Sequence, residues 1–136
     1  MKWIWKLETD LPPEADEVPS SALARALTPP RSRTGRQVVW ARALWRRFKD
    51  NQVAAELRHG ESVFELEGTI DHVDRDARGR IRVHFQVDRY ETLRMLLPEA
   101  AREEARVLRP GDLVRCLGRV AEVDCGVVEL EAVEAA

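Results

Sequence analysis

Residues 61–97 read ESVFELEGTIDHVDRDARGRIRVHFQVDRYETLRMLL, and residues 98–132 continue PEAAREEARVLRPGDLVRCLGRVAEVDCGVVELEA. Apolar and polar side chains alternate with a period of two along much of this stretch, which is typical of half-buried strands. The pattern predicts five strands, at residues 61–74, 80–88, 92–97, 113–121 and 127–132. A helix is predicted at residues 98–108, after the third strand.

This order of five strands with one helix after the third is the order that an OB-fold requires, a small Greek-key barrel used mostly for binding. The sequence therefore predicts a mainly β fold with flanking helices. The inward positions of the strands predict the barrel core: Phe64, Leu66, Ile81, Val83, Phe85, Val114, Cys116, Val128 and Leu130. Gly68 and Gly118 lie inside strands, which indicates close backbone approach or strong coiling there.

The chain is expected to divide into an N-terminal arm, residues 1–36, and a helix-plus-barrel domain, residues 37–136. Residues 37–59 show helical spacing of apolar side chains, with Gly60 as a stop and Asn51 at a potential kink. Residues 8–37 carry five prolines among polar side chains, which predicts a mobile linker.

Charge and cysteine content bound the function further. Residues 1–50 carry ten Lys/Arg against six Asp/Glu, residues 51–136 carry twelve against eighteen, and the formal net charge is −2. A near-neutral chain has no overall field to draw it to nucleic acid or lipid.

Cys116 is expected as a small core residue. The N-terminus lacks the apolar run of a signal peptide and no segment could span a bilayer, so the expected location is cytoplasmic.

Several elements resemble one known family. The residues in question are Ala43-Leu44 with Phe48, Asn51-Gln52-Val53-Ala54-Ala55, Gly60, Leu66-Glu67-Gly68-Thr69-Ile70, and the stretch LRPGDLVRCLG at residues 108–118. Together they resemble the tRNA anti-like OB-fold family of small bacterial proteins, over about residues 40–132. The resemblance implies nucleic-acid binding, by kinship with anticodon-binding OB domains. It brings no catalytic residues, and many similar proteins look exported or lipid-anchored.

OB-folds bind oligonucleotides on the outer face of their second and third strands. That face predicts a nucleic-acid site formed by Arg80, Arg82, His84, Tyr90 and Arg94. Cations track the phosphate backbone and aromatic rings stack on bases, but only one aromatic side chain lies near this stripe. The alternative is a solvated face whose arginines pair across strands with Glu65, Glu67 and Asp71.

A second function hypothesis is a protein-interaction module that docks through the arm and the first helix. Its candidate residues are Trp3, Trp5, Trp45 and Arg46, because Trp is enriched at interface hot spots. The alternative for Trp3-Ile4-Trp5 is an arm strand that docks on its own barrel.

Catalysis, cofactors and metals are not expected. His59, His72 and His84 show no nucleophile motif and no metal-ligand spacing. His72 lies near Asp71 and Asp74, but a histidine flanked by acids at a strand end is usually a solvated turn residue.

Overall fold

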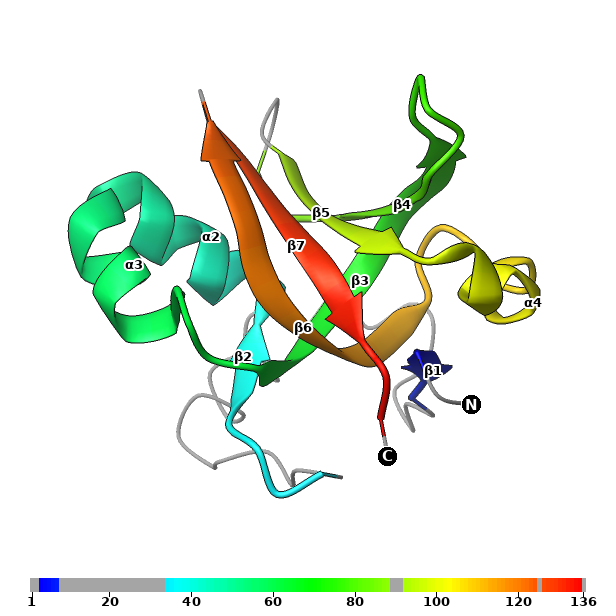
Figure 1. Cartoon of the computed structure of the whole chain (residues 1–136), viewed down its shortest axis with the longest axis horizontal. Helices are drawn as coiled ribbons and strands as arrows, with labels where there is room; N and C mark the ends of the chain where they lie inside the picture. The colour runs from blue at the N-terminus through cyan, green and yellow to red at the C-terminus, as the bar shows by residue number, and fades with distance from the viewer. Residues whose placement is uncertain (1–2, 8–33, 89–91, 125, 136) are drawn as a thin grey trace.

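The computed structural model describes residues 3–7, 34–88, 92–124 and 126–135 of the 136-residue chain. Its elements are, in chain order, β1 (Ile4–Lys6), β2 (Val38–Trp40), α2 (Ala41–Asp50), α3 (Gln52–His59), β3 (Phe64–Arg75), β4 (Ile81–Phe85), β5 (Thr92–Leu97), the 3-10 turn η1 (Glu99–Ala101), α4 (Arg102–Ala105), β6 (Leu113–Asp124) and β7 (Val127–Val133) (Figure 1).

Five of these strands close into a barrel. β3 pairs with β4, β4 with β5, β5 with β7 and β7 with β6, and β6 pairs back with β3. The β5–β7 pair is parallel, and the other four pairs are antiparallel. Figure 1 shows α2 and α3 at one side of the barrel and α4 at the other. The architecture is mainly β and consistent with an OB-fold.

The predicted barrel core is confirmed. All nine predicted inward residues belong to one buried cluster, and Val83 lies inside while Arg82 and His84 lie on the opposite side of β4. The strand glycines are sites of close approach, as predicted. A Cβ at Gly68 would lie 2.7 Å from the Phe85 ring, and one at Gly118 would lie 2.5 Å from the Met95 methyl group.

The N-terminal helical prediction needs correction, because residues 37–59 are not one helix. Val38 and Val39 are β-branched, and β2 pairs in parallel with the start of β3. The chain is extended again at Asn51, whose side chain accepts a hydrogen bond from the Ala54 amide and so begins α3. The helical segment after β5 is also shorter than predicted, ending at residue 105 instead of 108.

The arm docks on the chain's own barrel. β1 pairs antiparallel with β6, and Ile4 and Trp5 are buried. The Trp3 amide donates to Glu104 Oε1 at 3.0 Å, which ties the arm to α4. Residues 8–33, where most of the predicted mobile linker falls, lie outside the described residues. In the described part of the chain, no helix has both the length and the apolar character needed to cross a membrane.

Two carboxylates of β3 that were predicted to face water are buried. Glu65 and Glu67 are fully buried, so the expectation of a wet face along the first half of β3 is wrong. Arg115 of β6 lies between them, with its Nε 3.0 Å from Glu67 and its Nη1 3.4 Å from Glu65. Thr34 donates to Glu65 through its amide and its hydroxyl. Alternation along a strand defines two faces, but only the tertiary fold decides what covers each face.

Candidate functional site

Outward side chains of β3, β4, β5 and β7 form one continuous surface, called the outer face from here on. Its central members are His72, Asp74, Arg82, His84, Arg94 and Glu129. The strand register aligns His72 with His84, His84 with Arg94, and Arg94 with Glu129. A row of four polar side chains therefore crosses four strands.

A β-bulge in β3 places two members of this face. Ile70 pairs with Phe85, but the next pair joins His72 with His84, so Asp71 is the additional residue. Such a residue reverses the alternation that follows it. Val73 consequently packs against the core, while His72 and Asp74 lie opposite the outward residues of β4.

Each predicted arginine of this face has a carboxylate partner. Arg82 donates to both oxygens of Asp74, through Nε at 2.8 Å and Nη2 at 2.9 Å. Arg94 Nε donates to Glu129 Oε1 at 3.0 Å, and Arg80 Nε donates to Asp76 Oδ2 at 2.6 Å. The alternative prediction was that these arginines pair with carboxylates across strands. They do pair with carboxylates, but the carboxylates are not the predicted Glu65, Glu67 and Asp71. Glu65 and Glu67 are buried instead, beside Arg115 of β6.

Ion pairing with Arg82 shifts the pKa of Asp74, and burial shifts the pKa of His84. The Arg82 hydrogen bonds lower the pKa of Asp74 to about 2, so this carboxyl group is ionised at neutral pH. Burial lowers the pKa of His84, against the opposing pull of Asp74, 3.0 Å from its Nε2. The His84 ring stacks on that of His72, with centroids 4.0 Å apart and planes 10° apart.

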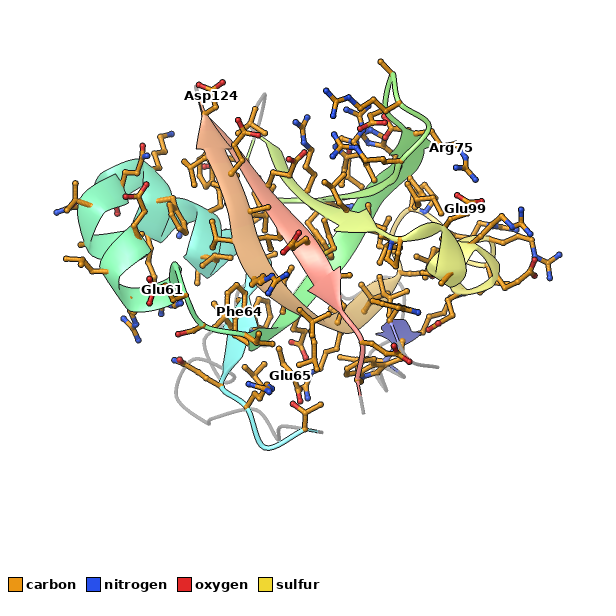
Figure 2. The ribbon with its side chains drawn as sticks, viewed as in Figure 1. Glu61, Phe64, Glu65, Arg75, Glu99 and Asp124 are labelled. Atoms are coloured by element: carbon orange, nitrogen blue, oxygen red, sulfur yellow. The ribbon has the colours of Figure 1, made fainter. Side chains whose placement is uncertain are left out.

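The β3–β4 hairpin extends the outer face. Arg75 Nη1 lies 3.0 Å from Glu99 Oε2, and Figure 2 shows these two side chains next to each other beside α4. Arg78 is exposed at the hairpin tip, and Gly79 takes the positive φ of 78° that the turn needs. This hairpin contributes cations near the predicted site.

The opposite end of the face is acidic. A hollow beside Arg94 is lined by Glu122, Asp124, Val127 and Glu129 in addition to the arginine. A second bulge, between Val120 and Glu122, brings Glu122 opposite Glu129. Tyr90, the aromatic residue predicted for this site, lies outside the described residues.

The helix surface differs from its prediction. Trp45 is buried in the core, with Lys49 Nζ 4.7 Å from its ring centroid, and Trp5 is buried in β1, where the arm docks on β6. Trp3 is half-buried against the core, and Arg46 is exposed on α2. The four predicted partner-binding residues thus do not form one exposed patch in this structure.

Sequence reasoning missed His72 and Asp74 as members of the outer face. The available signal was weak, because a bulge is not visible in a pattern of alternation. Val73 was a hint. If the alternation continued without interruption from the inward Ile70, residue 73 would point outward, yet it is apolar and lies between two polar residues. Glu129 occupies an outward position in the alternation of its strand, but its pairing with Arg94 depends on the parallel register of β5 and β7.

Comparison with solved structures supports the fold. The chain is similar to a putative nucleic acid-binding lipoprotein from Klebsiella pneumoniae, with a TM-score of 0.59 and 16% identity, covering 72% of this chain and 92% of that one. It is also similar to a putative aspartyl-tRNA synthetase from Leishmania major, with a TM-score of 0.53 and 8% identity, over 88% of this chain and 25% of that one. No family model and no curated protein matches the sequence. At these identities, the similarity shows the fold alone.

Proposed function

We propose that this chain is an OB-fold module that binds single-stranded nucleic acid through the outer face of β4 and β5. The barrel strands pair in the order β3, β4, β5, β7 and β6, and β6 closes back on β3. We infer from this order a Greek-key OB barrel in which β4 and β5 are the second and third strands. One observation carries the proposal: guanidinium groups from β4 and β5 lie on the face that OB-folds use for oligonucleotides. The two structural neighbours are described as a putative nucleic acid-binding lipoprotein and a putative aspartyl-tRNA synthetase, which agrees with this proposal.

Carboxylate pairing does not use up the donors of these arginines. A guanidinium has five N–H donors. Asp74 accepts from Arg82 at Nε and Nη2, and Arg80 and Arg94 each donate to their carboxylate partners through Nε. The ion pairs hold the side chains in place, and the remaining donors can meet a phosphate oxygen. The paired carboxylates also oppose a polyanion, so we expect modest affinity with strong dependence on salt.

The test measures fluorescence anisotropy of labelled mixed-sequence DNA and RNA single strands of about 15 nucleotides. Wild type should bind at low salt, with a log–log salt slope of about −0.7 per phosphate contact. Arg82→Gln and Arg94→Gln should each weaken binding and flatten the slope by about 0.7. Replacing Tyr90 with Ala should cost about 1–3 kcal/mol with little change of slope, because stacking releases no counterions.

Arg46→Ala is the matched control, since it removes one exposed cation from α2 and leaves the outer face intact. It should leave binding unchanged. Absence of binding to any of the strands at low salt, or a loss confined to Arg46→Ala, would refute the proposed surface. Thermal unfolding of each variant verifies that the barrel is intact.

A second candidate function is a protein-interaction module that docks through the N-terminal region. One observation favours it: Val53 and Leu57 lie one helical turn apart on α3 and are 67% and 85% exposed. Together with Arg46 of α2 they present apolar and cationic groups on the helix pair. Since Trp5 and Trp45 are buried, the helix pair replaces the tryptophans as the candidate contact surface. Replacing Val53 and Leu57 with Ser should abolish partner binding and leave oligonucleotide binding unchanged.

A further inference from the structure

Three potential metal ligands meet on the outer face. One nitrogen each from His72 and His84 and one carboxylate oxygen from Asp74 lie within 4.8 Å of one another. His84 Nε2 is 3.0 Å from Asp74 Oδ1, and His72 Nε2 is 3.9 Å from Asp74 Oδ2. The bulge in β3 creates this cluster, because it brings His72 and Asp74 to the face that His84 occupies.

These separations suit a small divalent ion. A tetrahedral ion with ligand bonds of 2.0–2.1 Å holds its ligand atoms about 3.3 Å apart. The two separations, which involve different oxygens of Asp74, bracket that value, so the three side chains lie close enough to share one ion once the ring of His72 turns. From this arrangement we propose that His72, Asp74 and His84 form a binding site for Zn²⁺. The site goes beyond the proposed nucleic-acid function and does not depend on it.

The surroundings of His72 support ligation. Asp71 Oδ2 lies 2.6 Å from His72 Nδ1, which fixes the proton on that nitrogen and leaves the lone pair of Nε2 available to a metal ion. A carboxylate behind a histidine ligand is the usual outer partner in zinc sites, where it orients the ring and raises its basicity. Asp71 therefore lies where the outer carboxylate partner of a zinc-bound histidine is usually found.

The chemistry of the ligands selects the ion. Two imidazoles and one carboxylate suit zinc, whereas magnesium and calcium prefer oxygen ligands alone. The three side chains are 49%, 35% and 10% exposed for His72, Asp74 and His84. An ion can thus reach the cluster from solvent, and one coordination position stays open to water, as in zinc sites with three protein ligands.

Two features oppose binding and give the proposal a distinctive signature. Arg82 holds both oxygens of Asp74, so its guanidinium repels an incoming cation. A metal ion lies in the plane of each imidazole that ligates it, and two stacked, nearly parallel rings cannot both meet that condition for one ion. The half-exposed ring of His72 must therefore turn on binding. We expect Arg82→Gln to strengthen zinc binding by about tenfold, whereas the same variant weakens nucleic-acid binding under the proposed function.

The experiment uses the full chain, stripped with a chelator and dialysed, without oligonucleotide. Calorimetric titration with ZnCl₂ should show one ion per chain, and CoCl₂ should give the visible absorption of a tetrahedral site. His72→Ala should reduce affinity at least tenfold. Asp71→Asn should reduce it about 10–100-fold, as loss of an outer-shell partner does. MgCl₂ should give no binding.

His59→Gln is the matched control, since it removes a histidine that lies outside the cluster. It should leave zinc affinity and stoichiometry unchanged. Because His84 is largely buried and its replacement can disturb folding, the exposed His72 provides the decisive variant. Absence of zinc binding in wild type, or equal affinity of wild type and His72→Ala, would overturn the proposal. Loss of nucleic-acid binding alone would leave the zinc site standing.

Discussion

His59 should make the stability of this protein depend on pH between 7 and 5. Its side chain is 1% exposed, and Arg47 Nη1 lies 3.1 Å from its Nε2, so a neutral ring accepts a hydrogen bond that an imidazolium could not. Burial, followed by the nearby charges of Arg47 and Arg58, lowers the pKa of His59 from 6.5 to about 4. The unfolded chain therefore binds a proton at a pH where the folded chain does not.

The sign and size follow from proton linkage. A histidine with a lowered folded pKa contributes stability that is present above pH 6.5 and is lost as the pH falls toward 4. With about 1.4 kcal/mol per pKa unit, the loss attributable to His59 between pH 7 and pH 5 is about 2 kcal/mol. The lowered pKa of Asp74 does not enter this window, because that carboxyl group titrates at lower pH.

Urea unfolding followed by tryptophan fluorescence at pH 7 and pH 5 measures the effect. His59→Gln lacks the titrating group but keeps an acceptor for Arg47, so its stability should change by about 2 kcal/mol less than that of wild type. Leu57→Gln is the control on the same helix, since its side chain is 85% exposed, and it should behave as wild type. Equal pH dependence in wild type and His59→Gln would refute the reasoning.

Two further substitutions test the packing of the fold. Arg115→Met should cost about 3–5 kcal/mol, because it removes the guanidinium that lies between the buried carboxylates of Glu65 and Glu67. Arg119→Ala, which removes an exposed partner of Glu131, should cost less than about 1 kcal/mol, and equal losses would contradict this account. Gly68→Ala should cost about 1–3 kcal/mol in thermal or urea unfolding, since its Cβ would press on the Phe85 ring; an unchanged stability would show that the barrel relaxes there.

The predictions that held rest on local pattern. Val83 and Phe85 alternate with Arg82 and His84, and the barrel follows that alternation because a half-buried strand must put its apolar side inward. The strand glycines were also predictable, since a missing side chain in a strand usually marks a neighbour that needs the space.

The predictions that failed depend on what covers an element. Val38-Val39-Trp40 was predicted as helix, yet it pairs with β3 because its β-branched residues meet an open strand edge. Glu65 and Glu67 alternate as solvent-facing residues do, but the arm and Arg115 bury them. No periodicity within β3 contains the information that a segment some thirty residues away lies across it.

By itself, the sequence determined the five barrel strands, their inward residues and the location of arginines on β4 and β5. Periodicity and turn residues are local properties, and they suffice for these features. Tertiary structure alone decided that Arg82 and Arg94 pair with Asp74 and Glu129, and that the β3 bulge brings His72 and Asp74 beside His84. Strand register and bulges depend on which strands become neighbours, so the chemistry of the outer face appears only once the barrel has closed.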